Sequence, residues 1–286
     1  MLANAKINLH LHITGRAENG YHLLDSLVAF TSLSDDISIE PSDKFKLNIS
    51  GSTSLSSVCS EQDNLISRVT HLLAQHLGIA PHVDIRLLKN IPLAGGLGGG
   101  SADAAATLLL LKDIWHIKSN DILEKIAASL GSDIVACLYN DPVIMRDTGN
   151  KILTAPRIPP LHGLLVNPNV QSPTPEVYKA YAQSNRPFSD NIVFPEQFHS
   201  AMELCAFLKA HTRNDLTDAA ITIAPEIGIV LNALDQIPNK LLSRLSGSGA
   251  TCFALFENAG DAQSGYELIK KAHPDFWAKT VTINQI

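Results

Sequence analysis

The chain has 286 residues, of which 45% are hydrophobic and 17% are charged, and its formal net charge is −6 at pH 7. This length and composition are typical of a globular enzyme with one large domain or two ordinary ones. The acidic balance argues against nucleic acid or an anionic membrane surface as a partner, whereas a small anionic substrate remains compatible with it.

Cysteine usage and the lack of targeting signals predict a cytoplasmic protein. The four cysteines are scattered without a C-x-x-C pair, so neither a disulfide framework nor a zinc site is expected. The opening residues MLANAKINLH lack the basic and apolar regions of a signal peptide, and no apolar run approaches the roughly 20 residues that span a bilayer. Its oligomeric state, monomer or homodimer, is left open by the sequence.

The first expected elements are a strand and a hairpin. Residues 6–13 alternate between polar and apolar side chains, which indicates a half-buried strand. The polar face of this strand carries Lys6, Asn8, His10 and His12. The two histidines have no third ligand in view, so a polar strand face is favoured over a metal site. Residues 35–58 combine short β-like runs with Ser/Gly turns and predict a hairpin.

A helix and a strand follow. Apolar side chains at helical spacing in residues 61–78 predict a helix that Asp63 or Asn64 caps and Gly78 ends. The alternation in residues 82–93 predicts a strand that leads directly into a glycine loop.

The glycine loop has five glycines in the six residues 95–100, and an alanine- and leucine-rich helix follows it. We expect Ser101 at the N-cap of that helix and Asp103 in its first turn. The loop matches neither the Walker A pattern, since no lysine follows the glycines, nor the Rossmann fingerprint. Bare N–H groups at a helix N-terminus favour a bound phosphate, and close packing of strand and helix is the alternative.

Residues 119–139 predict two helices separated at Gly131, the second with Ser132 as its N-cap and Asp133 in its first turn. An aspartate at that position commonly does no more than complement the positive end of the helix dipole.

The prolines of residues 141–175 indicate a domain boundary near residue 155. This boundary gives an N-terminal domain, 1–155, and a C-terminal domain, 156–286. In the second domain, SAMELCAFLKAH predicts a helix, and a second glycine turn, SGSG, precedes a strand at 251–256.

Motifs along most of the chain resemble those of the GHMP kinases. PLAGGLGGGSADAA resembles the central motif of that family, in which the loop wraps the phosphates of ATP. The segments similar to its other motifs are ANAKINLHLHITGRAENGYHLLDSLV, LGSDIVACL, SPTPEVYKAY and LSGSGATCFALF. The resemblance implies a two-lobed α+β fold, with most of the ATP site in the N-terminal lobe and the active site in the cleft between the lobes.

Within this family, the motifs most resemble those of the enzymes that phosphorylate the 2-hydroxyl group of 4-diphosphocytidyl-2-C-methyl-D-erythritol in non-mevalonate isoprenoid synthesis. It implies ATP as the phosphoryl donor and Mg²⁺ as the counterion of the nucleotide, with no dedicated metal ligands in the sequence.

The resemblance also implies roles for single residues. Spacing alone favours a solvated lysine at position 6, but the catalytic lysine and aspartate of the family match Lys6 and Asp133. Asp133 would accept the proton of the substrate hydroxyl, and Lys6 would stabilise the developing charge. The expected ATP-binding residues are Asn64, Pro92, Leu93, Ala94, Gly95, Gly96, Leu97, Gly98, Gly99, Gly100, Ser101 and Ala102.

The implied substrate site combines segments that are far apart in the sequence. Tyr21 and Tyr178 would stack on the cytosine ring. The residues expected to complete this site are Asn8, His22, Thr174, Gly247, Ser248 and Gly249.

The chain departs from the family pattern in several places, among them Ala94 and Ala102, which stand where the central motif often has glycine and serine. Where the family usually has Val-Pro-Phe after the aspartate, this chain has Ile134, Val135 and Ala136, which removes a preorganised helix start. The usual R-G-x-G-E motif reads RDTGN at 146–150.

Two other functions compete with this one. Another GHMP kinase, such as a homoserine or mevalonate kinase, is disfavoured by the G-Y-H and P-T-P-x-x-Y segments. A non-catalytic ligand sensor on the same fold is disfavoured because both Lys6 and Asp133 are retained.

Overall fold

The computed structural model describes residues 1–51, 64–93 and 95–284. The chain divides into two compact units. The first unit comprises Met1–Lys6, Leu33–Leu93 and Gly98–Asn140, and the second comprises Ile7–Ser32, Ala94–Leu97 and Asp141–Ile286. Because each unit contains several segments, the chain passes between the two more than once. The domain boundary near residue 155 stays a prediction.

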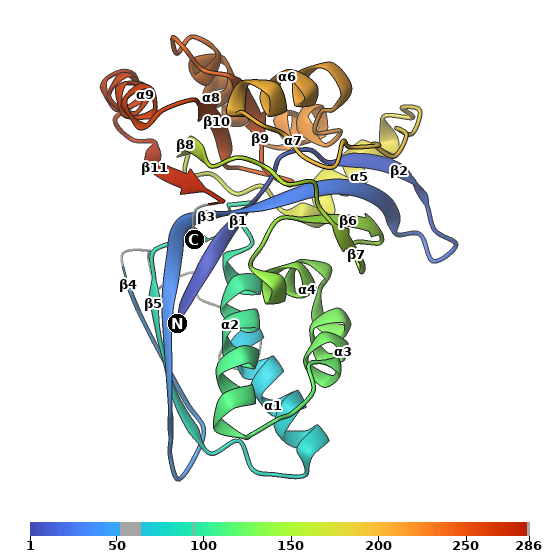
Figure 1. The fold of residues 1–286 in the computed structure, drawn as a ribbon, viewed down its shortest axis with the longest axis vertical. Coiled ribbons are helices and arrows are strands. Elements are labelled where there is room, and N and C mark those ends of the chain that lie inside the picture. Colours follow the sequence, from blue (N-terminus) through green and yellow to red (C-terminus); the bar gives the residue numbers. More distant parts are fainter. Residues whose placement is uncertain (52–63, 94, 285–286) are drawn as a thin grey trace. The chain divides into compact units, whose positions relative to one another are not determined.

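In the first unit, helices pack together on one side of a group of strands (Figure 1). Strand β5 (Val83–Lys89) lies between β4 (Lys46–Gly51), to which it is parallel, and the end of β3 (His22–Pro41), to which it is antiparallel. The four helices are α1 (Leu65–Leu77), α2 (Gly99–Ile114), α3 (Asp121–Leu130) and α4 (Ser132–Tyr139). Strand β1 (Leu2–Asn8) pairs with β3.

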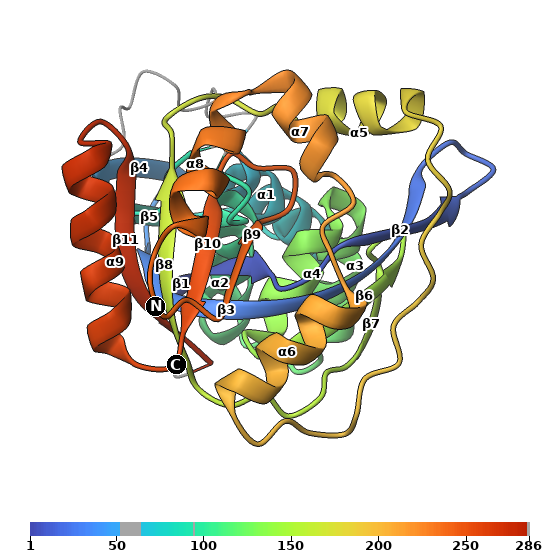
Figure 2. The same cartoon turned by 90° about the horizontal axis from the view of Figure 1, so that it is seen from above.

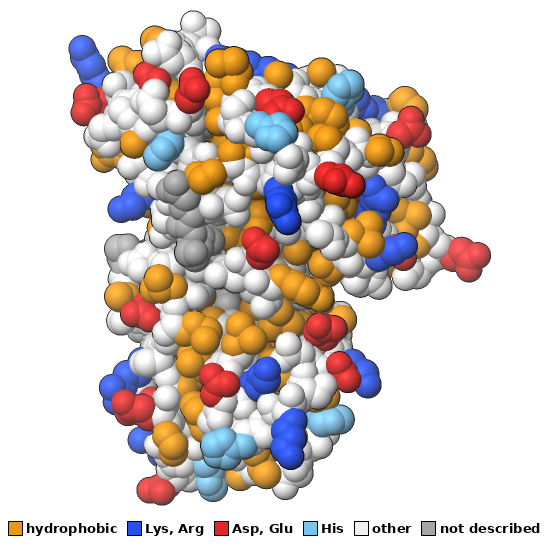
Figure 3. Space-filling view, viewed as in Figure 1, with side chains coloured by type: hydrophobic (Ala, Val, Ile, Leu, Met, Phe, Trp, Pro, Cys, Tyr) orange, Lys and Arg blue, Asp and Glu red, His pale blue; other side chains and the backbone are white. Residues whose placement is uncertain are grey.

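In the second unit, strand β8 (Leu161–Asn167) lies antiparallel between β10 (Cys252–Phe256) and β11 (Trp277–Ile283). Helices α8 (Glu226–Asp235) and α9 (Ala259–Ala272) pack on these strands (Figure 2). The other elements are β2 (His12–Arg16), β6 (Val143–Asp147), β7 (Lys151–Thr154), α5 (Thr174–Gln183), α6 (Ala201–His211), α7 (Thr217–Ile223) and β9 (Leu242–Leu245). On the face drawn in Figure 3, basic and acidic side chains are interspersed over the surface of each unit.

Four local predictions are confirmed. Helix α1 has Asn64 as its N-cap, whose side chain accepts a hydrogen bond from the Ile66 N–H, and Gly78 ends the helix in the left-handed conformation. Helix α6 begins after Ser200, and β10 follows the second glycine turn. The break between α3 and α4 falls at Gly131, although Gly131 itself, and not Ser132, is the N-cap of α4.

The predicted hairpin over residues 35–58 is wrong in its described part. Strand β4 does not pair with β3, because β5 occupies the position beside β3 and takes β4 as its parallel neighbour on the other edge. Residues 52–58 of the predicted hairpin lie outside the described residues.

The predicted half-buried strand over residues 6–13 is two strands, β1 and β2. They are separate because Leu11 exchanges backbone hydrogen bonds with Arg213 and Asp215, at 3.0 and 2.8 Å. The expected polar face is also buried: Lys6, Asn8, His10 and His12 are each at most 5% exposed. Burial of polar groups is tolerated where they find partners, and these four side chains have polar partners.

Candidate active site

Lys6 and Asp133 form an ion pair in the first unit, with 3.3 Å between Nζ and Oδ2. Lys6 comes from β1, and Asp133 lies in the first turn of α4, where the helix dipole favours a negative charge. The side chain of Lys6 is 6% exposed, whereas that of Asp133 is 38% exposed. The lysine is therefore a fixed, buried cation, and the carboxylate is the member of the pair that a substrate can reach.

The departure from the family pattern after Asp133 does not prevent a helix from forming. Helix α4 begins at Ser132 without a proline, and Val135 and Ala136 are buried at 6% and 1% exposure. The second departure lies in unit 2, where Asp147 adopts a positive φ of 62° at a position that is glycine in the family pattern. Aspartate is one of the few residue types that tolerate this conformation.

Helix α2 begins earlier than predicted. Its N-cap is Gly98 in the left-handed conformation, without a side-chain hydrogen bond, so Gly99 and Gly100 form the first turn. Ser101 is therefore not the N-cap, and Asp103 lies beyond the first turn. The first N–H groups of a helix have no acceptor within the helix, and here the N-cap, a glycine, has no side chain that could accept from them. They are available for an anion.

Close packing explains part of the glycine content. A Cβ atom at Gly96 would lie 2.4 Å from the Ser246 carbonyl oxygen, and one at Gly98 would lie 2.8 Å from Lys6 Cγ. At Gly99 it would lie 3.0 Å from Ile91 Cγ2. At Gly100, by contrast, its only neighbour within 4 Å among the described residues would be Leu65 Cδ1, at 3.7 Å. Packing therefore favours glycine at 96 and 98 and leaves little room at 99, but the described residues give no packing reason for Gly100.

The other predicted ATP-binding residues lie in varied surroundings. Gly95 accepts a hydrogen bond from the Thr251 N–H at 3.1 Å. Leu97 and Ala102 are buried, whereas Leu93 is exposed. Pro92 and Ser101 are half-buried, and Ala94 lies outside the described residues. Asn64 Oδ1 accepts the Ile66 N–H at 2.9 Å, so its oxygen is occupied by the helix cap.

Several of the predicted substrate-binding residues lie near one another in the second unit. The rings of His22 and Tyr178 have centroids 5.3 Å apart. Burial lowers the pKa of His22, and the nearby Arg16 adds to this decrease, so the imidazole is neutral near pH 7. Tyr21 is 68% exposed at the turn before β3, so its ring is available to a ligand.

The turn between β9 and β10 contacts the start of α5. The hydroxyl groups of Thr174 and Ser248 lie 2.7 Å apart, and Asn214 donates to the Gly247 carbonyl at 2.7 Å. Gly247 and Gly249 have φ of 56° and 90°, a region that favours glycine. Asn8 donates from Nδ2 to Ser26 Oγ at 2.9 Å.

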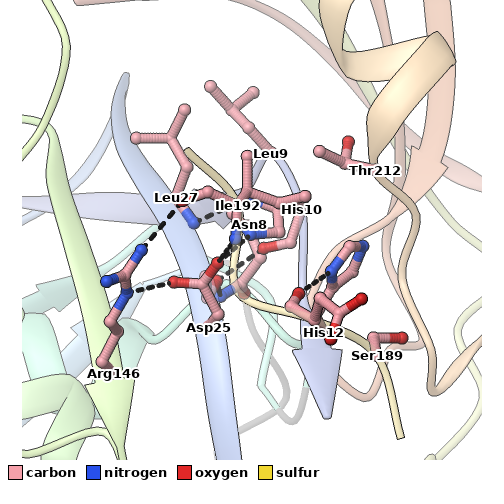
Figure 4. A network of polar contacts seen from close by, with 12 residues as sticks. Asn8, Leu9, His10, His12, Asp25, Leu27, Arg146, Ser189, Ile192 and Thr212 are labelled. Carbon is pink, nitrogen blue, oxygen red and sulfur yellow. Dashed lines mark hydrogen bonds and ion pairs between the residues drawn. The ribbon is translucent and has the colours of Figure 1, made fainter. Parts of the chain in front are cut away.

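Figure 4 shows a buried network around His10 and Asp25, with Asn8 drawn among its residues. His10 Nδ1 accepts the Leu27 N–H at 3.0 Å, which leaves Nε2 to donate to Asp25, at 3.4 Å. Burial lowers the pKa of His10 despite the opposing effect of Asp25, so the ring is neutral. Asp25 also accepts from Arg146 Nε and the Ile192 N–H, both at 2.7 Å.

His12 is likewise a structural hydrogen-bonding residue. Its Nε2 accepts the Arg213 N–H at 3.2 Å, and its Nδ1 lies 3.0 Å from the Asp190 carbonyl oxygen. Within the described residues, no three His, Cys, Asp or Glu side chains converge on a position that could hold a metal ion.

Sequence reasoning missed a buried charged cluster beside the glycine loop, consisting of Asp35, Lys89 and Asp103. The strand periodicity contained a signal for it. Lys89 shares its side of β5 with Val83, Ile85 and Leu87, which are buried. A lysine on a buried strand face requires a carboxylate partner.

Comparison with known proteins agrees with this geometry. A model of the N-terminal domain of GHMP kinases matches residues 64–141, and a model of their C-terminal domain matches residues 195–275. A 4-diphosphocytidyl-2-C-methyl-D-erythritol kinase of Paramagnetospirillum magneticum is 40% identical over 278 residues, covering 96% of this chain and 95% of that protein. The chain belongs to the GHMP kinases.

Other similar proteins carry the same enzyme name. A protein of the same name from Cereibacter sphaeroides is 42% identical, over 96% of this chain and 95% of its own. A crystal structure of 4-(cytidine 5'-diphospho)-2C-methyl-D-erythritol kinase matches with a TM-score of 0.80 and 28% identity, covering 100% of this chain and 99% of that chain. L. major mevalonate kinase, at 12% identity and a TM-score of 0.71, shares the fold. The predicted GHMP kinase fold is confirmed.

In residues 1–51, 64–93 and 95–284, no helix is both long enough and apolar enough to cross a bilayer.

The open space at Gly100 gives a test of the anion-binding loop. Gly100→Val places methyl groups at the first turn of α2, and among the described residues only Leu65 lies within 4 Å of the new Cβ. We expect the KM for ATP to rise by about tenfold or more, since the side chain obstructs approach to the helix N-terminus. Thermal stability should not fall, because glycine is the weaker helix former.

The control is Gly228→Ala in α8, where the added Cβ makes an ordinary 3.6 Å contact with Ile221. It should leave the KM for ATP unchanged. A Gly100→Val protein that is folded and has a normal KM for ATP would show that the phosphates do not approach the first turn of α2, and the anion-binding loop would be wrong. Gly98 is unsuitable for this test, because its Cβ would displace Lys6.

Proposed function

We propose that this chain transfers the γ-phosphoryl group of ATP to the 2-hydroxyl group of 4-diphosphocytidyl-2-C-methyl-D-erythritol, in non-mevalonate isoprenoid precursor synthesis. The observation that carries the proposal is identity of about 40%, over at least 95% of each chain, to kinases named for this substrate. The Lys6–Asp133 pair adds the chemical groups that phosphoryl transfer to an alcohol requires.

Asp133 is the acceptor for the hydroxyl proton in this proposal. Phosphoryl transfer needs a group that orients the attacking hydroxyl and takes its proton as the new P–O bond forms. The exposed carboxylate can do this, while the buried ammonium of Lys6, 3.3 Å away, holds it in place. The same cation stabilises negative charge that develops on the transferring phosphoryl group.

ATP is the phosphoryl donor of GHMP kinases, and the start of α2 is suited to its phosphates. The N-cap Gly98 supplies no side-chain cap, and among the described residues only Leu65 lies within 4 Å of a Cβ at Gly100. An uncapped helix N-terminus of this kind is suited to an anion. Mg²⁺ would enter as the counterion of the nucleotide phosphates, because in kinases this ion is usually bound by substrate phosphates, several waters and one or two carboxylates. It neutralises charge on the phosphates when bound. The proposed ATP-binding residues remain those of the loop from Pro92 to Ala102, together with Asn64.

The cytosine ring would be bound by the second unit. Tyr178 and His22 are neighbours there, and the exposed ring of Tyr21 supplies a second stacking surface. A neutral His22 can hydrogen-bond the polar edge of the base, and burial and Arg16 keep it neutral by lowering its pKa. Asn8, Thr174 and the turn Gly247–Gly249 complete the proposed site. Cytoplasmic location and oligomeric state stay predictions.

The experiment that tests the proposed function measures ADP formation by the purified protein with three alcohols in turn. The acceptors are 4-diphosphocytidyl-2-C-methyl-D-erythritol, homoserine and mevalonate. Turnover is expected only with the cytidyl compound. Turnover with homoserine or mevalonate instead would assign the chain to another GHMP kinase activity, and ligand binding without turnover would make it a sensor.

The substrate-binding residues are tested by truncating the two aromatic rings. Stacking a base on an aromatic ring contributes about 1–3 kcal/mol, so Tyr21→Ala and Tyr178→Ala should each raise the KM for the cytidyl substrate about 5- to 150-fold. Tyr→Phe should be much milder at either position, because stacking uses the ring face. The KM for ATP should hardly change.

Tyr139→Ala is the matched control, since Tyr139 is an exposed tyrosine of α4 in the first unit. It should leave the KM for the cytidyl substrate as in the wild type. If Tyr21→Ala and Tyr178→Ala also leave the KM for the cytidyl substrate unchanged, the assignment of the cytosine site is wrong.

A further inference from the structure

Three buried charged residues lie beside the glycine loop in the first unit. Lys89, the last residue of β5, contacts Oδ2 of Asp35 and lies 2.8 Å from Oδ2 of Asp103. Asp35, Lys89 and Asp103 are 0%, 5% and 3% exposed. Buried charges are costly unless they are paired, so this cluster has a stability cost that an apolar core would avoid.

The contacts of the cluster fall on the two ends of the loop. Asp35 Oδ1 accepts the N–H groups of Asn90 and Ile91, at 2.6 and 2.8 Å, where the chain leaves β5. Asp103 lies in α2, one turn after the loop ends. Lys89 joins the two carboxyl groups. Its Nζ also lies 3.4 Å from the Cβ position of Gly99, in the first turn of α2.

We propose that Asp35, Lys89 and Asp103 form a positioning triad that holds the entry and the exit of the glycine loop in the geometry that binds the phosphates of ATP. This inference rests on the proposed function. None of the three residues touches the nucleotide in this account. They act through the backbone of Asn90 and Ile91 and through the placement of α2.

The two carboxyl groups of the triad are not equivalent. Asp35 accepts three hydrogen bonds, from Lys89, Asn90 and Ile91, which stabilise its charge. Asp103 accepts one from Lys89, and its Oδ1 is buried without a partner among the described residues. With one cation for two carboxylates, Asp103 is the one that holds a proton near neutral pH.

The electrostatic surroundings of Asp103 agree with this assignment. Burial raises its pKa well above the usual range, Lys89 opposes the increase, and Asp35 adds to it. On α4, the thiol of Cys137 interacts electrostatically with Asp103, Asp133 and Lys6, and burial raises the pKa of this thiol. The protonated triad is neutral. Ionisation of Asp103 at higher pH gives it a net negative charge beside the loop, which weakens the binding of a triphosphate.

The test measures the KM for ATP and for the cytidyl substrate in Asp35→Asn and Asp103→Asn. Asp35→Asn keeps an oxygen for the N–H groups of Asn90 and Ile91 but puts an NH2 group where Oδ2 accepts from the buried Lys89 ammonium. The loss of this acceptor costs about 1–3 kcal/mol, so the KM for ATP should rise about tenfold or more. The KM for the cytidyl substrate should change much less. Asp103→Asn mimics the protonated carboxyl, so its effect near pH 7 should be several-fold smaller than that of Asp35→Asn.

The pH dependence gives a readout that a purely structural role would not move. Between about pH 7 and 9, the wild-type KM for ATP should rise as Asp103 loses its proton, and Asp103→Asn should flatten this rise. Asp36→Asn is the matched control, since Asp36 is the exposed neighbour of Asp35 and pairs with the N-terminal ammonium. It should behave as the wild type at every pH.

Failure of the triad and failure of the proposed function are distinguishable. If the wild type does not use ATP, the proposed function is wrong, and so is the positioning role of the triad. If the wild type uses ATP and Asp35→Asn keeps a normal KM for ATP, the triad alone is wrong. Should Asp35→Asn not fold, Asp103→Asn decides: a flattened pH profile supports the triad, and a profile parallel to that of the wild type overturns it.

Discussion

The ion pair between Lys6 and Asp133 is the interaction on which the rest of the candidate site depends. It joins β1 to the first turn of α4, and the stem of Lys6 fills the space where a side chain at Gly98 would lie. The N-cap of α2 must therefore be a glycine. A buried cation and a reachable carboxylate are thus fixed beside the helix that follows the glycine loop, before any substrate binds, which is the preorganisation that electrostatic catalysis requires.

Much of the fold follows from local sequence signals. Helical spacing between Asn64 and Gly78 predicts α1, because both ends carry residues that satisfy exposed backbone groups. Alternation predicts β5, and Ser200 marks the start of α6. The pairing of Lys6 with Asp133 could be predicted only through the resemblance to a family, since the spacing of these residues gives no reason for contact.

The remainder depends on contacts between distant segments. The partners of Lys89 are 54 and 14 residues away, so the period-2 pattern of β5 shows that it points inward but not which carboxylates meet it. The hairpin prediction failed because β5 inserts beside β3. The start of α2 was misplaced because Ser101 carries the usual capping signal, whereas Gly98 is selected by its left-handed conformation and its contact with Lys6.

The most direct test of the central claim is a double-mutant cycle on kcat with Lys6→Met, Asp133→Asn and the double variant. If the two residues act as a unit, each single change should lower kcat by about 10²- to 10⁴-fold, and the double variant should be little worse than the more severe single one. The exposed pair Arg86–Glu40, 3.5 Å apart in the same unit, is the control, and Arg86→Met with Glu40→Gln should leave kcat unchanged. A double variant whose loss equals the product of the two single losses would contradict the account, because Lys6 and Asp133 would then act independently.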